Sequence, residues 1–274
     1  MQNQSSPLIL TFGVLDPVGA LGVQADLATF AAFGCHALSV PTALLVADSA
    51  RVEELHELDT GWMADQARVV LEDMPVAAVK IGAIASIEQA AAIAEIVSDY
   101  ADVPLIVDPF LSSLPDAGMS DEDTVAAIRQ ILAPQATVLM LSQAELGRMA
   151  ESWREPGADS TLEADVAELT GRGCQYVLVT CTQGSGHNRA NTLFDRDGMV
   201  TTIDWQHLAG PFVGAGTTLS GALAALMAQG LDAPEALAAA QEFTYGALRH
   251  ARRFGMGKLV PNRFHRTQFA LGRQ

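Results

Sequence analysis

The chain has 274 residues, of which 49% are hydrophobic and 18% are charged. This length and apolar fraction are enough to bury a large core in one α/β domain or two small ones, and we expect one domain over residues 1–274. The chain carries 32 acidic and 16 basic residues, a formal net charge of −16. A phosphate backbone or an anionic membrane is repelled on average by such a charge, so we expect neither nucleic acid nor a membrane as partner.

Cysteine usage and the N-terminal segment indicate a cytoplasmic protein. Cys35, Cys174 and Cys181 are an odd number of cysteines without metal-ligand spacing, which argues against a disulfide framework and fits a reducing compartment. The first apolar run stops at Asp16 and has no basic lead. We therefore expect neither a signal peptide nor a membrane span.

Five short, continuous apolar runs have the pattern of parallel strands that are buried on both faces. They are LILTFGV (8–14), AAVKIG (77–82), PLIVDPF (104–110), ATVLML (136–141) and QYVLVTC (175–181). The alanine-rich segments 86–100 and 120–132 predict helices between them, and Ser120 and Ser160 are candidate helix N-caps. Strands and helices alternate at the spacing of βαβ units, so we expect an α/β fold with helices on both sides of the sheet.

The last third of the chain departs from this rhythm. The segment NTLFDRDGMVTTIDWQ predicts two strands joined at Asp197-Gly198, which is a common hairpin signal. This hairpin predicts a small antiparallel edge to the sheet. Two further helices, over 217–229 and about 234–253, are expected to close the chain.

The stretch GPFVGAGTTLSGALAALMAQG (210–230) joins a glycine turn to an apolar helix. The apolar residues recur at helical spacing, so the helix begins near Gly216. Its first backbone N–H groups have no partner within the helix, the glycines allow a ligand to approach closely, and the helix dipole favours negative charge. We expect an anion to bind there. The alternative is a turn whose glycines only allow close helix packing.

The segment DPVGALGVQADLATFAAFGCHALSVPTAL (16–44) resembles the opening signature of the hydroxymethylpyrimidine and phosphomethylpyrimidine kinases of thiamine synthesis. These kinases are a branch of the ribokinase superfamily. The resemblance continues, in order, through VKIGAI (79–84), IVDPF (106–110), SQAE (142–145), VLVT (177–180) and the glycine turn. It implies a ribokinase-like, doubly wound, mostly parallel sheet flanked by helices. It also implies ATP with Mg²⁺, a small-molecule alcohol as substrate, phosphoryl transfer to the hydroxymethyl group of a pyrimidine, and a homodimer.

The resemblance also implies roles for individual residues on the phosphate side of the site. The transferring phosphoryl group is expected at the turn and its helix, which comprise Gly214, Ala215, Gly216 and Thr217. Ser142 and Glu145 stand at the two ends of the family's NxxE element, which organises Mg²⁺ and phosphates. Thr180 takes the nucleotide-side strand end, and Asp108 and Glu145 are the expected Mg²⁺ ligands.

On the substrate side, the resemblance implies that Asp26 hydrogen-bonds the pyrimidine. Three other positions depart from the family pattern. Val14 replaces a glycine before Asp16, Ala47 replaces a glutamine that reads the pyrimidine, and Phe110 replaces a valine.

Thr217 stands where this family has a cysteine and the wider superfamily an aspartate that serves as base or activating group. Ser142 likewise replaces the asparagine of NxxE. A threonine hydroxyl has a pKa far above neutral pH, so Thr217 cannot act as a general base, although it can orient a hydroxyl or a phosphate oxygen. A replacement base would have to come from the aspartates near the strand ends, which are Asp16, Asp26, Asp48 and Asp108.

Three functions remain open on these residues. The first is a kinase of the thiamine-precursor type, the second a non-catalytic or regulatory ligand-binding homologue that has lost its base, and the third a pyridoxal kinase that takes a pyridine alcohol. The basic run RHARRFGMGKLVPNRFHR (249–266) is expected to be a solvated helix end, with contact to ATP phosphates as the alternative.

Overall fold

The computed structural model describes residues 6–111, 122–151, 153, 161–185 and 188–267. Within these residues, one nine-stranded sheet has the order β3-β2-β1-β4-β5-β6-β7-β8-β9. Its strands are β1 (Leu8–Leu15), β2 (His36–Ala47), β3 (Val52–Glu57), β4 (Ala78–Ile81), β5 (Leu105–Val107), β6 (Val138–Ser142), β7 (Tyr176–Gln183), β8 (Arg189–Asp195) and β9 (Gly198–Trp205).

The centre of the sheet is parallel and both of its edges are antiparallel. Strands β2, β1, β4, β5, β6 and β7 pair in parallel, whereas β3 pairs antiparallel with β2, and β8 and β9 follow β7 antiparallel. The five predicted strands and the predicted hairpin at Asp197-Gly198 are confirmed. The pair β2–β3 was not predicted, because β3 has no buried residue and β2 is interrupted by exposed positions and by Pro41.

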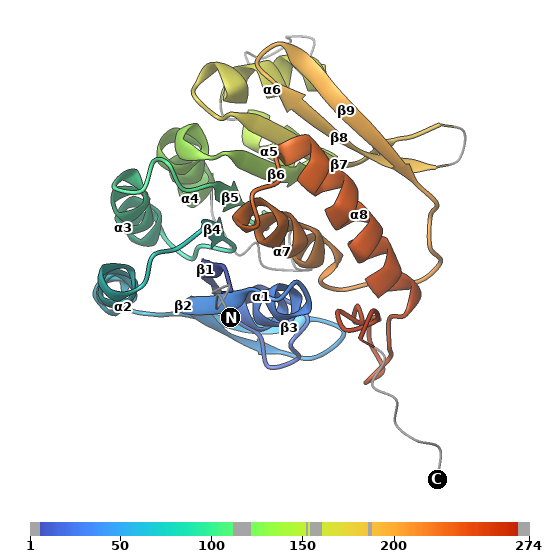
Figure 1. Cartoon of the computed structure of the whole chain (residues 1–274), viewed down its shortest axis with the longest axis horizontal. Helices are drawn as coiled ribbons and strands as arrows, with labels where there is room; N and C mark the ends of the chain where they lie inside the picture. The colour runs from blue at the N-terminus through green and yellow to red at the C-terminus, as the bar shows by residue number, and fades with distance from the viewer. Residues whose placement is uncertain (1–5, 112–121, 152, 154–160, 186–187, 268–274) are drawn as a thin grey trace, which may run out of the picture.

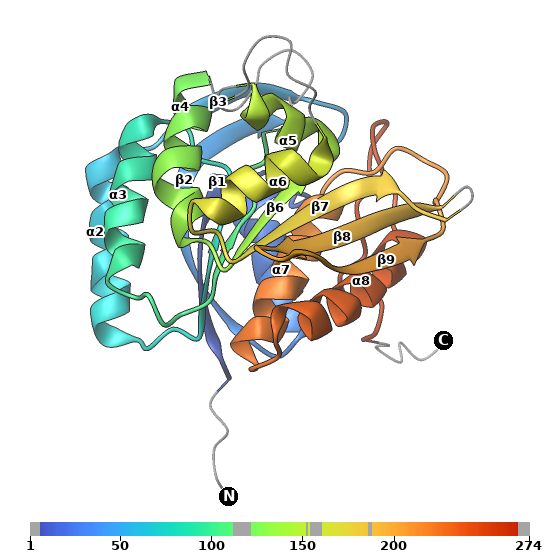
Figure 2. The same cartoon turned by 90° about the horizontal axis from the view of Figure 1, so that it is seen from above.

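The helices lie on both faces of the sheet, as Figures 1 and 2 show. Helices α2 to α6 pack on one face, and α1, α7 and α8 pack on the other. Their bounds are α1 (Gly22–Ala32), α2 (Thr60–Asp73), α3 (Ile87–Ser98), α4 (Glu122–Ala127), α5 (Gln143–Ala150), α6 (Leu162–Gly171), α7 (Ala215–Ala228) and α8 (Ala233–Arg249), with a π-helical turn after α4 at Ile128–Leu132. The expected doubly wound α/β fold is confirmed, whereas the predicted N-caps Ser120 and Ser160 lie outside the described residues.

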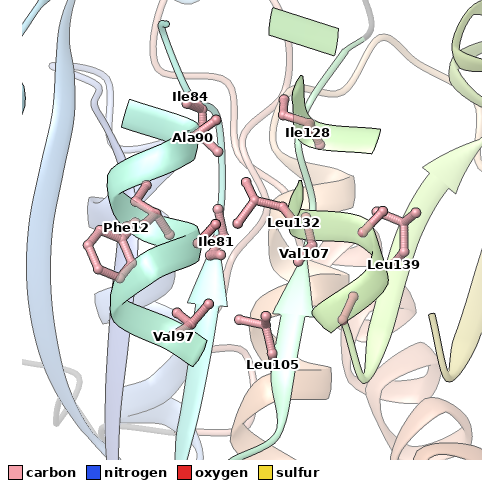
Figure 3. Close-up of a cluster of buried hydrophobic side chains, with 14 of the residues drawn as sticks. Phe12, Ile81, Ile84, Ala90, Val97, Leu105, Val107, Ile128, Leu132 and Leu139 are labelled. Carbon is pink, nitrogen blue, oxygen red and sulfur yellow. The ribbon is translucent and has the colours of Figure 1, made fainter. Parts of the chain in front are cut away.

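Two buried apolar layers hold the helices to the sheet. Alternate residues of each strand point to opposite faces, so Phe12 and Ile81 belong to the layer under α2 to α6, whereas Ile9 and Ala78 belong to the layer under α1, α7 and α8. Figure 3 shows the first layer, in which the side chains of β1, β4, β5 and β6 meet those of α3 and the turn after α4. Burial on both faces explains why the central strands are apolar throughout.

Strand order places a crevice at one edge of the sheet. From β1 the chain runs outward to β2 on one side, and β4 then returns to the other side of β1. Such a reversal leaves room at the carboxyl ends of the two strands, where ligands of doubly wound folds bind. The loop at 16–21 follows β1 and the loop at 82–86 follows β4, and both therefore border this crevice. In the described part of the chain, no helix is long and apolar enough to span a membrane.

Candidate functional site

The glycine turn ends in a helix whose first amides are free. Gly214 is the N-cap of α7 and has φ +83°, and no side chain caps the helix. A Cβ atom at Gly214 would overlap the carbonyl oxygen of Ala20, so the position requires glycine. Among the described residues, none accepts a hydrogen bond from the backbone N–H groups of Ala215, Gly216 or Thr217. These three N–H groups, called here the amide cradle, lie at the positive end of the helix dipole, an arrangement that favours an anion.

A small pocket, called here the inner pocket, lies beside the amide cradle at the crevice. It is lined by Val14, Leu21, Gly22, Lys80, Gly82, Ala83, Asp108, Phe110 and Thr217. The space inside is about 10 Å³, roughly what one water molecule needs. A ring-sized alcohol therefore fits only after the side chains of the wall move.

Asp108 follows β5 and forms the polar floor of the inner pocket. Its Oδ2 accepts a hydrogen bond of 2.6 Å from Ser220 Oγ, which lies one turn after Thr217 on α7. Burial raises the pKa of Asp108 to about 6, and the nearby Lys80 charge and the Ser220 hydrogen bond oppose this rise. The Glu145 carboxylate is close enough to raise the pKa of Asp108 further.

Glu145 and Ser142 fix each other at the start of α5. The backbone N–H of Ser142 donates to Glu145 Oε2 at 2.7 Å, and the backbone N–H of Glu145 donates to Ser142 Oγ at 3.2 Å. This reciprocal capping box explains how a serine can occupy the first position of the element. Glu145 is 8% exposed, so it is largely shielded from solvent.

The carboxylates of Asp108 and Glu145 provide oxygen ligands of the kind that Mg²⁺ prefers. Two like charges held near each other in a buried place are stabilised by a cation between them. The described residues contain no group of three or more His, Cys, Asp or Glu side chains that could hold a metal ion by themselves. This donor set fits a Mg²⁺ ion that takes its remaining ligands from water and phosphate oxygens.

Asp26 lies beneath the inner pocket rather than in its wall. It is fully buried, and its carboxylate accepts from Thr11 Oγ1 at 2.7 Å and pairs with Lys80 Nζ at 2.8 Å. Lys80 is itself 1% exposed and lines the inner pocket. Asp26 therefore acts on the pocket through Lys80 in this arrangement. Its predicted hydrogen bond to a pyrimidine stays a prediction.

The three other predicted substrate residues share one apolar cluster. Val14 belongs to a buried cluster with Leu21, and Ala47 and Phe110 pack against it. Val14 and Phe110 line the inner pocket, whereas Ala47 is not among the residues described as lining it. Phe110 has φ +50°, an uncommon conformation for a bulky residue.

The four candidate bases are in different environments. The Asp16 carboxylate accepts from the backbone N–H groups of Val18, Ala20 and Leu21, which fixes the loop after β1. Asp48 lies in the turn between β2 and β3, where its carboxylate accepts from the amides of Ala50 and Arg51 and these bonds lower its pKa. Asp26 is held by Lys80. Of the four, Asp108 is the one that lines the inner pocket with Thr217.

A second hollow of about 100 Å³, called here the outer pocket, includes two residues of the amide cradle, Ala215 and Gly216, in its wall. It is lined by Thr180, Cys181, Asn191, Trp205, Ala215, Gly216, Leu219, Gln241, Thr244, Tyr245 and Leu248. Thr180 lies opposite Ser142 in the strand register. Trp205 Nε1 and Thr244 Oγ1 are buried and have no hydrogen-bond partner among the described residues. Unpaired buried polar atoms are costly, so a ligand or a water molecule that bonds to these two atoms would stabilise the pocket.

Volume alone does not identify the site. A larger hollow of about 500 Å³ lies between α6 and the strands β7 to β9, and its lining includes Glu163 and Thr202. The residues that line it do not include the amide cradle. The inner and outer pockets are smaller, but both are lined by residues of the amide cradle, Thr217 in the inner pocket and Ala215 and Gly216 in the outer pocket.

Sequence reasoning did not single out four residues that shape the site. Lys80 could have been found, because a lysine inside an apolar strand needs a buried carboxylate partner. Ser220 and Thr244 look like ordinary small helix residues in the sequence. The basic run at 249–266 was expected to be a solvated helix end, but α8 ends at Arg249 and Arg263 is 4% exposed.

Comparison with known proteins identifies relatives over almost the whole chain. The sequence model described as phosphomethylpyrimidine kinase matches residues 16–262. The chain is 31% identical to a hydroxymethylpyrimidine/phosphomethylpyrimidine kinase of Rhizobium meliloti over 262 residues, which are 94% of this chain and 97% of that one. It is 29% identical to the thiamine biosynthesis bifunctional protein ThiED of Geobacter sulfurreducens, covering 91% of this chain and half of that protein's length.

The fold also matches a solved structure. An ADP complex of Bacillus subtilis pyridoxal kinase superposes with a TM-score of 0.84, at 22% identity, and covers 95% of this chain and 98% of that one. The resemblance stated from the sequence motifs and the expected ribokinase-like fold are confirmed.

Proposed function

The chain belongs to the phosphomethylpyrimidine kinase family, and from this premise we propose that it is an ATP-dependent kinase that phosphorylates the hydroxymethyl group of a pyrimidine in thiamine biosynthesis. The observation that carries the proposal is the amide cradle, whose residues line both the inner and the outer pocket. A phosphoryl group held there would face an alcohol in the inner pocket and a nucleotide in the outer pocket.

The protein contributes positioning and charge. The amide cradle holds the oxygens of the transferring phosphoryl group, and because these amides are aligned before the reaction, they stabilise its charge without reorganisation. Asp108 and Glu145 would hold Mg²⁺, which when bound neutralises phosphate charge. The Thr217 hydroxyl orients the acceptor alcohol and does not take its proton.

The outer pocket supports the nucleotide part of the proposal. Trp205 Nε1 is a donor and Thr244 Oγ1 can donate or accept, so the two atoms can read the edge of a heterocyclic base. Thr180 borders the same pocket, in agreement with its predicted nucleotide-side position. The related fold of Bacillus subtilis pyridoxal kinase was solved with ADP, which is consistent with ATP as cofactor.

The closed inner pocket and the threonine at the base position favour a second candidate, a ligand-binding homologue with little or no turnover. Removal of a general base costs roughly 10² to 10⁴ in rate. Slow phosphorylation by positioning alone is therefore the expected behaviour of an active enzyme with Thr217. The cytoplasmic location, the single domain over residues 1–274 and the homodimer are further parts of the proposal.

A coupled assay with ATP and Mg²⁺ over a panel of pyrimidine and pyridine alcohols tests the proposed function. It is run on the natural protein and on Thr217→Cys. We expect slow turnover with a hydroxymethylpyrimidine, a gain of at least about tenfold in the cysteine variant, and little turnover with pyridoxal. Equal and rapid rates for both proteins would show that Thr217 does not occupy the base position. Ligand-dependent thermal shifts without product would favour the non-catalytic homologue, and preference for pyridoxal would favour a pyridoxal kinase.

A further inference from the structure

Arg263 is a buried cation directly behind the amide cradle. Its side chain is 4% exposed and donates to acceptors on two separate segments of the chain. Nη1 donates to the carbonyl of Gly19 at 3.1 Å and Nη2 to the carbonyl of Ala20 at 2.7 Å, both in the loop after β1. Nε donates to Thr218 Oγ1 at 3.1 Å and Nη2 also reaches the carbonyl of Gly214 at 3.4 Å, both at the start of α7.

The loop after β1 is thus held from both sides. The Asp16 carboxylate accepts from its amides, those of Val18, Ala20 and Leu21. Arg263 donates to its carbonyls. This loop contributes Leu21 to the wall of the inner pocket. A single guanidinium therefore ties the acceptor side of the site to the turn that bears the amide cradle.

The chain segment that carries Arg263 is docked on the same turn. The Leu259 amide donates to the Pro211 carbonyl at 2.8 Å, and the Val213 amide donates to the Leu259 carbonyl at 3.0 Å. Val260 pairs in turn with Arg252, and their two backbone bonds are 2.9 Å long. These backbone hydrogen bonds fix the segment after α8 against the turn and so place Arg263 beside it.

The Gly214 carbonyl connects this cation to the amide cradle. It belongs to the same peptide group as the Ala215 N–H, and it accepts from Thr218 N, Thr218 Oγ1 and Arg263. Hydrogen bonds that polarise a carbonyl strengthen its N–H as a donor. Burial lowers the pKa of Arg263 to about 10, so the guanidinium stays charged at neutral pH. In a chain of net charge −16, this cation also favours an anion at the cradle.

We propose that Arg263 is a positioning residue that holds the acceptor-side loop and the amide cradle as one rigid unit and strengthens the cradle as an anion site. The expected effect of Arg263 on the reaction rate rests on the proposed kinase function, whereas its effect on the rigidity of the two segments does not. The planar fork is essential to this role, because one ammonium group cannot reach acceptors on both segments in the same geometry. We therefore expect Arg263→Lys to hold the loop and the amide cradle together less firmly than the natural protein does.

Hydrogen–deuterium exchange on the ligand-free protein tests the rigid unit directly. In Arg263→Ala and Arg263→Lys, we expect the hydrogen-bonded backbone amides of both segments, 19–21 in the loop and Val213 and Thr218 at the turn, to exchange at least about tenfold faster. Arg266→Ala is the matched control, because Arg266 is 52% exposed and pairs with Glu242 at 3.0 Å, away from both segments. Unchanged exchange in both segments of the Arg263 variants, or faster exchange in one segment alone, would overturn the proposal.

Kinetics and rescue test the effect on the reaction. Below the unfolding temperature of each variant, we expect Arg263→Lys to lower kcat about tenfold at saturating ATP and acceptor and to weaken ADP binding. We expect guanidinium ion at low millimolar concentration to raise the kcat of Arg263→Ala at least about threefold. A residue with only a structural role would lower Tm without changing kcat below Tm and without rescue, and that result would contradict the proposal.

The two proposals fail in distinguishable ways. If the natural protein phosphorylates no alcohol of the panel, the proposed kinase function fails. The exchange measurement and the affinity for ADP then still decide on Arg263, because neither requires turnover. If Arg263→Ala does not fold, Arg263→Lys carries the same measurements with the charge retained.

Discussion

Ser220 Oγ donates a 2.6 Å hydrogen bond to Asp108 Oδ2, and this contact fastens the end of β5 to the first turns of α7. It brings a carboxylate 112 residues distant in sequence against the helix that carries the amide cradle. The bond satisfies one oxygen of a carboxylate that is otherwise disfavoured by burial. The charged form of Asp108 therefore costs stability in the metal-free protein.

That cost predicts a pH-dependent effect of Asp108→Asn. Burial raises the pKa of Asp108 from 3.8 to about 6, so the native state disfavours the charged form. The stability of the protein therefore falls as the pH rises from about 4 to about 6, and the full loss is present above pH 6. The asparagine variant lacks this loss. We expect it to match the natural protein near pH 4 and to exceed it by up to roughly 3 kcal/mol at pH 7.5.

Urea unfolding in EDTA between pH 4 and 8 measures this difference. Ser98→Ala is a control, because Ser98 is exposed and bonds only the Glu95 carbonyl of its own helix. A stability difference that does not grow with pH would show that the Asp108 carboxylate is not disfavoured by burial.

The two glycines of the turn predict opposite effects of alanine. At Gly214 a Cβ atom would overlap the Ala20 carbonyl and the backbone has positive φ, so Gly214→Ala should lose about 2 kcal/mol or more. At Gly216 a Cβ atom would meet only Met140, at an ordinary 3.7 Å, inside a helix. Gly216→Ala should therefore keep or raise stability by up to about 1 kcal/mol. Chemical denaturation of both variants checks the pair, and equal losses would disagree with the described turn.

The buried pair of Lys80 and Asp26 predicts strong coupling. Lys80→Met leaves the Asp26 carboxylate buried and without its cation, so we expect a loss of roughly 3–5 kcal/mol. Adding Asp26→Asn removes the orphaned charge and should recover most of that loss. A double-mutant cycle by urea unfolding gives the coupling energy. Additive losses would show that the two side chains do not depend on each other.

The outer pocket predicts a loss of nucleotide affinity without a loss of fold. Trp205→Phe removes the buried donor Nε1 and keeps most of the ring, so we expect ADP to bind about five to tenfold more weakly. Trp62→Phe is the matched control, because Trp62 is 72% exposed on α2. Calorimetric titration measures both variants. If Trp205→Phe and the natural protein bind ADP with the same affinity, the outer pocket does not bind the adenine base.

Local features of the fold could be predicted from the sequence, because their signals are local. Continuous apolar runs predict the central strands, Asp197-Gly198 predicts the hairpin, and the stripe after Gly216 predicts α7 within two residues of its start. The β2–β3 pair could not be predicted in this way. Its hydrophobic pattern is interrupted by exposed positions and by Pro41, and its pairing is set by packing at the edge.

Contacts between distant segments limit what the sequence predicts about the site. The glycine turn and the carboxylates Asp108 and Glu145 could be placed by motif. The sequence could not show that Asp26 forms an ion pair with Lys80, 54 residues away. Nor could it show that Arg263, near the end of the chain, donates to the Gly214 carbonyl. Such pairings depend on the tertiary packing of segments that are distant in sequence, which short patterns do not encode.

The most direct test of the central claim is a crystal structure with ADP, Mg²⁺ and a phosphoryl mimic such as aluminium fluoride. We expect the mimic within hydrogen-bond distance of the Ala215, Gly216 and Thr217 amides, about 2.7–3.2 Å from N to acceptor, with the adenine base in the outer pocket. A structure in which the nucleotide binds elsewhere, and these amides bond to the protein's own atoms, would contradict that claim.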